Sequence, residues 1–186
     1  ELLTPDLKQR FFDKLEAELF VAYGCTEALG ATARTCSPVE DDPAIVDVGR
    51  PAPLMEAFVL DSKRRLSPVG VPGEIYLGGA LASGYLNDPV ATSERFVAHP
   101  FDQTPGARLF RTGDLGRWLP DGNRDVLGRR DSQVKVRGYR VELGEIETNL
   151  AKHDVVARCV VALREERAGD PGRGHQVPLL RERGVA

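Results

Sequence analysis

The sequence predicts a mixed α/β (α+β) fold that is built mainly from short strands and β-hairpins and contains few helices. Three observations support this class. The 186 residues include 19 glycines and 13 prolines, which supply many turns. Several short segments alternate between apolar and polar residues with the period of a strand. Helical spacing of apolar residues occurs in only three segments, 4–18, 88–96 and 142–153.

The first 36 residues predict a helix, a strand and a turn. Thr4 is suited to cap a helix, Pro5 to occupy its first turn, and Leu7, Phe11 and Leu15 to form one apolar face. The run LFVAYG at 19–24 predicts a buried strand of the parallel type that Gly24 closes. The following residues, 25–33, are expected to form a turn or the start of a helix. Residues 36–53, rich in Pro and Asp, predict a loop.

The central region predicts hairpins. The segments 55–61 and 73–79 are expected to be strands joined by a polar turn. Asp88 and Pro89 favour the start of a short helix. The segments 107–119 and 124–129 flank PDGN, a sequence typical of a hairpin turn.

The end of the chain predicts a strand, a helix and a strand. Val134 and Val136 alternate with polar residues, and the helix of 142–153 has Leu143, Ile146 and Leu150 on one face. A last strand is expected within 155–163. The residues after it show no pattern, so we expect a disordered tail over 168–186.

Charge and cysteine content exclude several classes of protein. The net charge is −3, with +3 over residues 128–186 and −6 over the rest, which disfavours a nucleic-acid-binding protein. Cys25, Cys36 and Cys159 lack the spacing of a zinc site or disulfide framework, and reduced thiols favour a cytoplasmic location. We expect no membrane association, because no apolar run approaches the ~18 residues of a membrane span.

Four motifs occur in order along the chain: YGCTE at 23–27, GEIYLGGALASGYLNDP at 73–89, FRTGDL at 110–115, and GRRDSQVKVRGYRVELGEIE at 128–147. Together they resemble the adenylate-forming, AMP-binding enzymes, and most closely the amino-acid adenylation domains of nonribosomal peptide synthetases. The resemblance implies an ATP-dependent ligase that forms an aminoacyl-AMP and loads a phosphopantetheine carrier protein. Its implied partners are the amino acid, the carrier protein and an upstream condensation domain.

The resemblance also assigns roles to individual residues. Tyr23 would offer its ring to the adenine, with Gly24 beside the nucleotide, and Thr26 would donate to the α-phosphate. Glu27 would hold Mg²⁺, because hard cations prefer carboxylate oxygens. Asp114 would accept both ribose hydroxyls, and Arg129 would contact ribose or phosphate. The catalytic set is thus Thr26, Glu27 and Arg129. The side-chain pocket of the substrate would include Ala22, Gly30 and Ala31. The segment 78–89 is expected to serve the fold only.

The implied domain organisation places the end of a large domain, its sheet and a distorted β-barrel region, at residues 1–130. Asp131 would be the hinge about which a small α+β domain, beginning at 131–167, rotates. The phosphate loop and most of the acid-binding pocket are expected upstream of Glu1, which is not a methionine, so we expect a piece of a longer protein.

The sequence departs from the family pattern at several positions. Cys25 stands where the family usually has Pro, and Val126 where it usually has an aromatic residue. The catalytic lysine expected near the end is missing, since no Lys follows Lys152. We therefore expect this chain to be inactive alone.

Two alternatives remain open from the sequence. The chain could belong to an acyl-CoA synthetase or an aryl-acid ligase, which share the motif GYRVELGEIE. It could also be a non-catalytic, truncated paralogue that acts as a binding or docking module.

Overall fold

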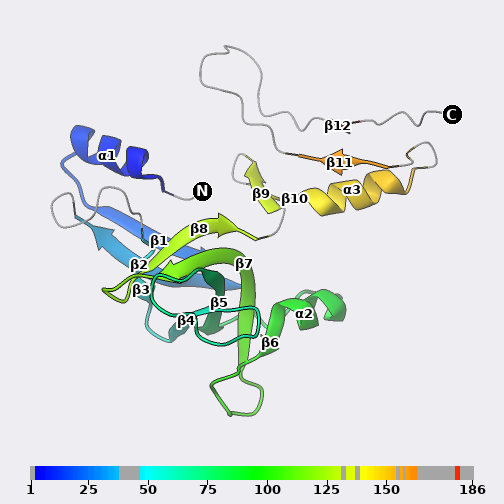
Figure 1. Cartoon of the computed structure of the whole chain (residues 1–186), viewed down its shortest axis with the longest axis horizontal. Coiled ribbons are helices and arrows are strands. Elements are labelled where there is room, and N and C mark those ends of the chain that lie inside the picture. Colours follow the sequence, from blue (N-terminus) through cyan, green and yellow to red (C-terminus); the bar gives the residue numbers. More distant parts are fainter. Residues whose placement is uncertain are drawn as a thin grey trace. The chain divides into compact units, whose positions relative to one another are not determined.

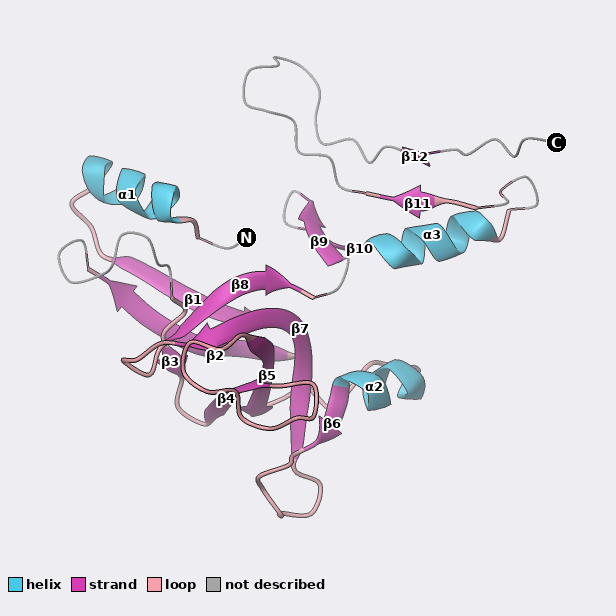
Figure 2. Ribbon diagram, in the orientation of Figure 1, coloured by secondary structure: helices cyan, strands magenta, loops and turns pink. Residues whose placement is uncertain are grey.

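The computed structural model describes residues 3–37, 47–130, 133–136, 139–153, 156, 158–162 and 179–180. The chain divides into two compact units, Leu2–Arg130 and Asp131–Ala186. Figures 1 and 2 show that both units combine helices with strands. The mixed α/β class expected from the sequence is therefore confirmed.

In the described residues, the first unit contains two sheets and two helices. One sheet has the strand order β1-β2-β3, and the other has the order β4-β5-β7-β6, with β8 paired to β7. The elements are α1 (Pro5–Lys14), β1 (Leu19–Cys25), β2 (Ala28–Cys36), β3 (Arg50–Pro51), β4 (Met55–Leu60), β5 (Gly73–Gly79), α2 (Pro89–Arg95), β6 (Phe96–Ala98), β7 (Arg108–Trp118) and β8 (Arg124–Arg129).

Both predicted helices of this unit form where their capping residues indicate. The Thr4 hydroxyl accepts a hydrogen bond from the Leu7 amide, and the Asp88 carboxylate accepts one from the Ala91 amide. Each bond satisfies an amide that has no partner within the helix. Helix α1 ends at Lys14, before the end of the predicted segment.

The predictions for residues 19–33 were partly wrong. Strand β1 is not a buried parallel strand: it pairs antiparallel with β2, and its residues alternate between half-buried and exposed. The segment after Cys25 does not start a helix. Thr26 and Glu27 form a two-residue turn, and the chain returns at once as β2. A register shift between Tyr23 and Cys25 marks a bulge, because the single residue Gly24 of β1 lies opposite residues 29–31 of β2. The turn lacks the Asn-Gly or Asp-Gly pair that usually announces a hairpin, so the sequence pattern did not reveal it.

The larger sheet follows its prediction closely. Strands β4 and β5 pair antiparallel over their whole length, and β7 and β8 form the hairpin around the PDGN turn. In Figure 1 the long, curved β7 runs beside β8. The expected loop 36–53 contains two-residue strand β3, which pairs with β2, while residues 38–46 lie outside the described part.

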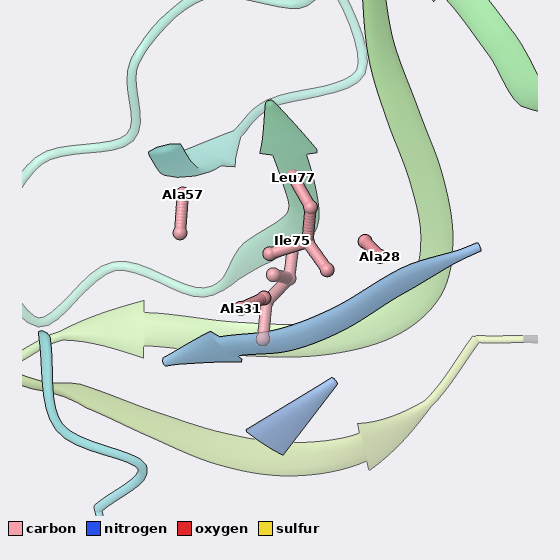
Figure 3. Close-up of a cluster of buried hydrophobic side chains, with 5 residues drawn as sticks. All are labelled: Ala28, Ala31, Ala57, Ile75 and Leu77. Atoms are coloured by element: carbon pink, nitrogen blue, oxygen red, sulfur yellow. The ribbon is translucent and has the colours of Figure 1, made fainter. Parts of the chain in front are cut away.

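A small hydrophobic core lies between the two sheets. Figure 3 shows its five side chains from β2, β4 and β5, namely Ala28, Ala31, Ala57, Ile75 and Leu77. A second cluster, centred on Leu60, Tyr76 and Leu109, uses the alternate residues of β4 and β5. Because neighbouring residues of a strand point to opposite faces, β5 contributes to both clusters. This packing fixes the position of the β1–β2 hairpin relative to the larger sheet.

The described part of the second unit contains a hairpin, a helix and two very short strands: β9 (Gln133–Val136), β10 (Tyr139–Glu142), α3 (Leu143–Ala151), β11 (Val160–Val161) and β12 (Leu179–Leu180). Strand β10 occupies residues for which the sequence pattern predicts no strand, and β11 is shorter than predicted. Within the tail, β12 pairs antiparallel with β11. Residues 163–178 and 181–186 lie outside the described part.

Candidate functional site

Two of the predicted nucleotide-binding residues, Tyr23 and Arg129, contact a third, Asp114. The Tyr23 hydroxyl donates to Oδ2 of Asp114 at 2.5 Å, and Nη1 of Arg129 donates to Oδ1 of the same carboxylate at 2.8 Å. Tyr23 lies 91 residues before Asp114, and Arg129 lies 15 residues after it. The side chain of Asp114 is 17% exposed and that of Arg129 is 23% exposed. We call Tyr23, Asp114 and Arg129 the Asp114 cluster.

Strand pairing and a local turn position the Asp114 cluster. Asp114 and Arg129 are register partners in the β7–β8 hairpin. Gly113 has a φ of +80°, which favours glycine. The Thr112 hydroxyl accepts from the Asp114 amide at 3.0 Å and donates to the carbonyl oxygen of Ile75 at 2.7 Å. These bonds explain why the sequence TGD holds the carboxylate in place, and Thr112 is a supporting residue that sequence reasoning missed.

The electrostatics of the Asp114 cluster keep Tyr23 protonated. Burial raises the pKa of Tyr23 well above its ordinary value, and the charge of Asp114 raises it further. The neutral hydroxyl is then a donor to the carboxylate, while the guanidinium of Arg129 supplies the compensating positive charge. The Asp114 carboxylate thus lies between a neutral donor and a cation.

Thr26 and Glu27 form a second group at the tip of the β1–β2 hairpin. Thr26 is exposed, whereas Glu27 is only 6% exposed. The hydroxyl of Tyr85 donates to Oε1 of Glu27 at 2.6 Å. Sequence reasoning missed Tyr85, because it assigned the whole GGALASGYLNDP motif to the fold. Glu27 follows an antiparallel hairpin strand and not the buried parallel strand predicted for residues 19–24.

Gly24 allows the two strands of this hairpin to approach closely. A Cβ at this position would lie 2.8 Å from the carbonyl oxygen of Ala28 and 2.9 Å from the amide nitrogen of Gly30. Both are backbone atoms, which cannot turn aside. Gly24 is therefore required by the geometry that brings Tyr23 and Glu27 onto one hairpin.

The three expected pocket residues differ in exposure. Ala31 is 0% exposed and packs in the core between the sheets, whereas Ala22 and Gly30 are exposed. Neighbouring residues of a strand point to opposite faces, which explains why Gly30 is exposed and Ala31 is buried. The expected hinge, Asp131, lies outside the described residues.

A cavity of about 280 Å³ lies elsewhere in the first unit. Its lining includes Glu74, which is bound at once by Arg111, at 2.8 Å, and Arg130, at 3.1 Å. None of the residues assigned to the nucleotide lines it.

Other kinds of site are absent from the described residues. No three His, Cys, Asp or Glu side chains gather there as a metal-binding group. The three cysteines are free thiols. No helix in this part of the chain has the length and apolar character needed to cross a membrane.

Comparison with known proteins identifies relatives. Residues 1–86 match the family described as AMP-binding enzyme. The chain is 54% identical over 154 residues to a component of the linear gramicidin synthase of Brevibacillus parabrevis, and the match covers 82% of this chain and 3% of the relative. It is 47% identical over 164 residues to tyrocidine synthase 3 of the same organism, over 87% of this chain and 2% of the relative. Such small shares mean that this chain spans only a short part of these proteins.

Solved structures give the same result. The crystal structure of IdnL1 superposes with a TM-score of 0.79 at 33% identity, over 88% of this chain and 34% of IdnL1. PA1221, a nonribosomal peptide synthetase protein containing adenylation and PCP domains, gives a TM-score of 0.78 at 26% identity, over 96% of this chain and 36% of PA1221. The motifs, the fold and these similarities together show that the chain belongs to the AMP-binding enzyme family and represents part of an adenylation domain of the nonribosomal peptide synthetase type.

Proposed function

We propose that the protein carrying this chain activates an amino acid with ATP and that this chain supplies part of the nucleotide site. The observation that carries the proposal is the Asp114 cluster. Its three residues come from β1, β7 and β8 and were assigned to the nucleotide from separate motifs. If the motifs served only the fold, there would be no reason for Tyr23 and Arg129 to bind the same carboxylate, that of Asp114.

The Asp114 cluster suits the recognition of a nucleoside. A carboxylate has about four acceptor positions, so Asp114 can accept both ribose hydroxyls while it stays in contact with Arg129. Arg129 would add a contact to ribose or phosphate. The ring of Tyr23 would lie against the adenine, and its hydroxyl would orient the carboxylate.

Thr26, Glu27 and Mg²⁺ would act on the phosphates. Mg²⁺ usually binds one or two carboxylates together with substrate phosphates and water, so a single buried carboxylate such as Glu27 fits it. When bound, Mg²⁺ supplies positive charge to the phosphates. The hydroxyl of Thr26 would donate to the α-phosphate.

The proposed reaction is the attack of the amino-acid carboxylate on the α-phosphorus of ATP. A bond forms between the carboxylate oxygen and phosphorus, and the bond to pyrophosphate breaks. The residues of this chain would orient the α-phosphate and offset its charge. Because no Lys follows Lys152, we expect the 186 residues alone to give no ATP–pyrophosphate exchange.

The surrounding organisation is proposed on the same basis. Leu2–Arg130 would be the C-terminal part of the large domain, Asp131 the hinge, and 131–167 the start of the small domain. The activated amino acid would pass to a phosphopantetheine carrier protein, and an upstream condensation domain would act on the loaded carrier. Ala22, Gly30 and Ala31 are kept as proposed pocket residues.

A matched pair of variants tests the nucleotide role. Asp114 and Asp125 both lie in the β7–β8 hairpin, and each carboxylate is paired with an arginine, Arg129 or Arg117. We expect the 186-residue chain to bind AMP. Asp114→Asn should weaken binding about tenfold or more, the size expected for lost charge-assisted hydrogen bonds. Asp125→Asn should leave binding unchanged. Equal effects of the two variants, or no AMP binding by the wild type, would contradict the proposal.

A second experiment separates this function from the acyl-CoA synthetase alternative. The full-length protein is supplied with ATP, amino acids and either a carrier protein or coenzyme A. We expect thioester formation on the carrier protein. Thioester formation on coenzyme A alone would favour the alternative.

A further inference from the structure

The buried carboxylate of Glu27 is contacted by a tyrosine from a distant segment. The hydroxyl of Tyr85 donates to Oε1 at 2.6 Å across 58 residues of sequence. A second bond, from the amide of Ala82 to the carbonyl oxygen of Glu27 at 2.8 Å, joins the same two segments. The loop between β5 and α2 therefore holds both the backbone and the side chain of Glu27.

Tyr85 is itself held firmly by α2. Its amide donates to the Thr92 hydroxyl at 2.9 Å, and that hydroxyl donates to the carbonyl oxygen of Asp88 at 2.7 Å. Its ring packs against Phe96, with the ring centroids 5.8 Å apart. These contacts hold the Tyr85 side chain in place independently of its bond to Glu27. The Tyr85 hydroxyl therefore approaches Glu27 from a fixed position.

We propose that Tyr85 is a positioning residue for Glu27 that directs its carboxylate toward the cation on the nucleotide. The proposal rests on the proposed function of Glu27 as a Mg²⁺ ligand. A hydroxyl that donates to Oε1 restricts the rotation of the carboxylate that would hold the cation. Groups that orient a metal ligand in this way typically change metal affinity when they are removed.

The role of the Tyr85 hydroxyl can be separated from that of its ring. Phenylalanine would keep the ring contact with Phe96 and the amide bond to Thr92, and would remove the donor to Glu27. Tyr76 offers a matched control, because it is a buried tyrosine of the same unit that packs with Leu60 and Leu109.

The test uses the wild-type chain and the variants Tyr85→Phe, Tyr76→Phe and Glu27→Gln. Binding of ATP is measured with increasing Mg²⁺ and again with EDTA. For Tyr85→Phe we expect the Mg²⁺ concentration at half-effect to rise about tenfold to a hundredfold, the size expected for one lost hydrogen bond to a charged metal ligand. Its ATP affinity in EDTA and its urea unfolding midpoint should match those of Tyr76→Phe.

The outcomes distinguish failure of this inference from failure of the proposed function. If Glu27→Gln removes the Mg²⁺ dependence and Tyr85→Phe leaves it unchanged, the positioning role is overturned and the function stands. If Tyr85→Phe weakens ATP binding equally in EDTA, its role is structural and the inference is also overturned. If the wild type binds ATP without any effect of Mg²⁺, or if Glu27→Gln has no effect, the proposed role of Glu27 fails and the inference fails with it.

Discussion

Replacement of Asp114 by Asn tests whether the Asp114 cluster is held by charge. The substitution keeps the shape of the side chain and removes its negative charge. Asn can still accept from Arg129 through its oxygen, and the Tyr23 hydroxyl can turn to accept from the new amide. The number of hydrogen bonds is therefore conserved, and what changes is their strength.

The expected loss of stability follows from that difference. Hydrogen bonds to charged groups contribute about 1.5–3 kcal/mol each, and neutral ones about 0.5–1.5 kcal/mol. The change affects two bonds and costs about 1 kcal/mol for each, so we expect the free energy of unfolding to fall by about 2 kcal/mol. The two side chains are only 17% and 23% exposed, so solvent screens this pair less than it screens a surface ion pair.

The pH dependence gives a second, independent signature. In the wild type, the folded state keeps the Tyr23 proton above pH ~10, where the unfolded state loses it. The contribution of Tyr23 to stability is therefore fully present below about pH 10 and falls above it. Asp114→Asn removes the charge that raises the pKa of Tyr23, while burial still raises it. The fall above about pH 10 should be smaller in this variant.

Two assays check these expectations. Urea unfolding, followed by the fluorescence of the single tryptophan, Trp118, measures the stability, and tyrosinate absorbance measures the titration. Asp125→Asn is the control: we expect a similar loss of stability, because Arg117 donates to Asp125 through two nitrogens, and an unchanged titration of Tyr23. If Asp114→Asn is as stable as the wild type and titrates identically, the Asp114 cluster does not exist in solution.

Three further predictions concern other parts of the chain. Gly24→Ala should lower the free energy of unfolding by about 1–3 kcal/mol, because its Cβ meets the Ala28 carbonyl, whereas Gly144→Ala, with no atom within 4 Å, should be neutral or stabilising in urea unfolding. His99→Leu should cost about 1–2 kcal/mol in the same assay and His99→Asn less, because Nδ1 of His99 accepts two backbone amides that Asn can still bind. Burial and the adjacent carboxylate of Glu27 raise the pKa of Cys25 to about 11. Alkylation of Cys25 in metal-free buffer, followed by mass spectrometry, should therefore stay slow until well above pH ~9. Alkylation that rises with pH as it does for an exposed thiol would contradict this.

Local signals allowed the sequence to predict much of the fold. The caps of α1 and α2, the alternation in β4 and β5, and the PDGN turn each depend on neighbouring residues, and all formed as expected. The β1–β2 hairpin was missed because local signals do not show which strand β1 pairs with. A short apolar run looks alike in a parallel and an antiparallel strand.

For the candidate site too, the sequence identified residues but not the contacts between them. The four motifs by themselves identified the family and pointed to Tyr23, Thr26, Glu27, Asp114 and Arg129, because each motif is a short string of residues. They could not reveal which side chains touch.

Only the tertiary structure decided that Tyr23 and Arg129 share the carboxylate of Asp114, that Tyr85 binds Glu27, and that Ala31 is buried in the core. These contacts join residues up to 91 positions apart. Periodicity and capping act over a few residues, whereas strand register and the packing of two sheets bring distant side chains within hydrogen-bonding distance. The sequence by itself therefore determined the chemical groups of the site, and the folding of the sheets determined their partners.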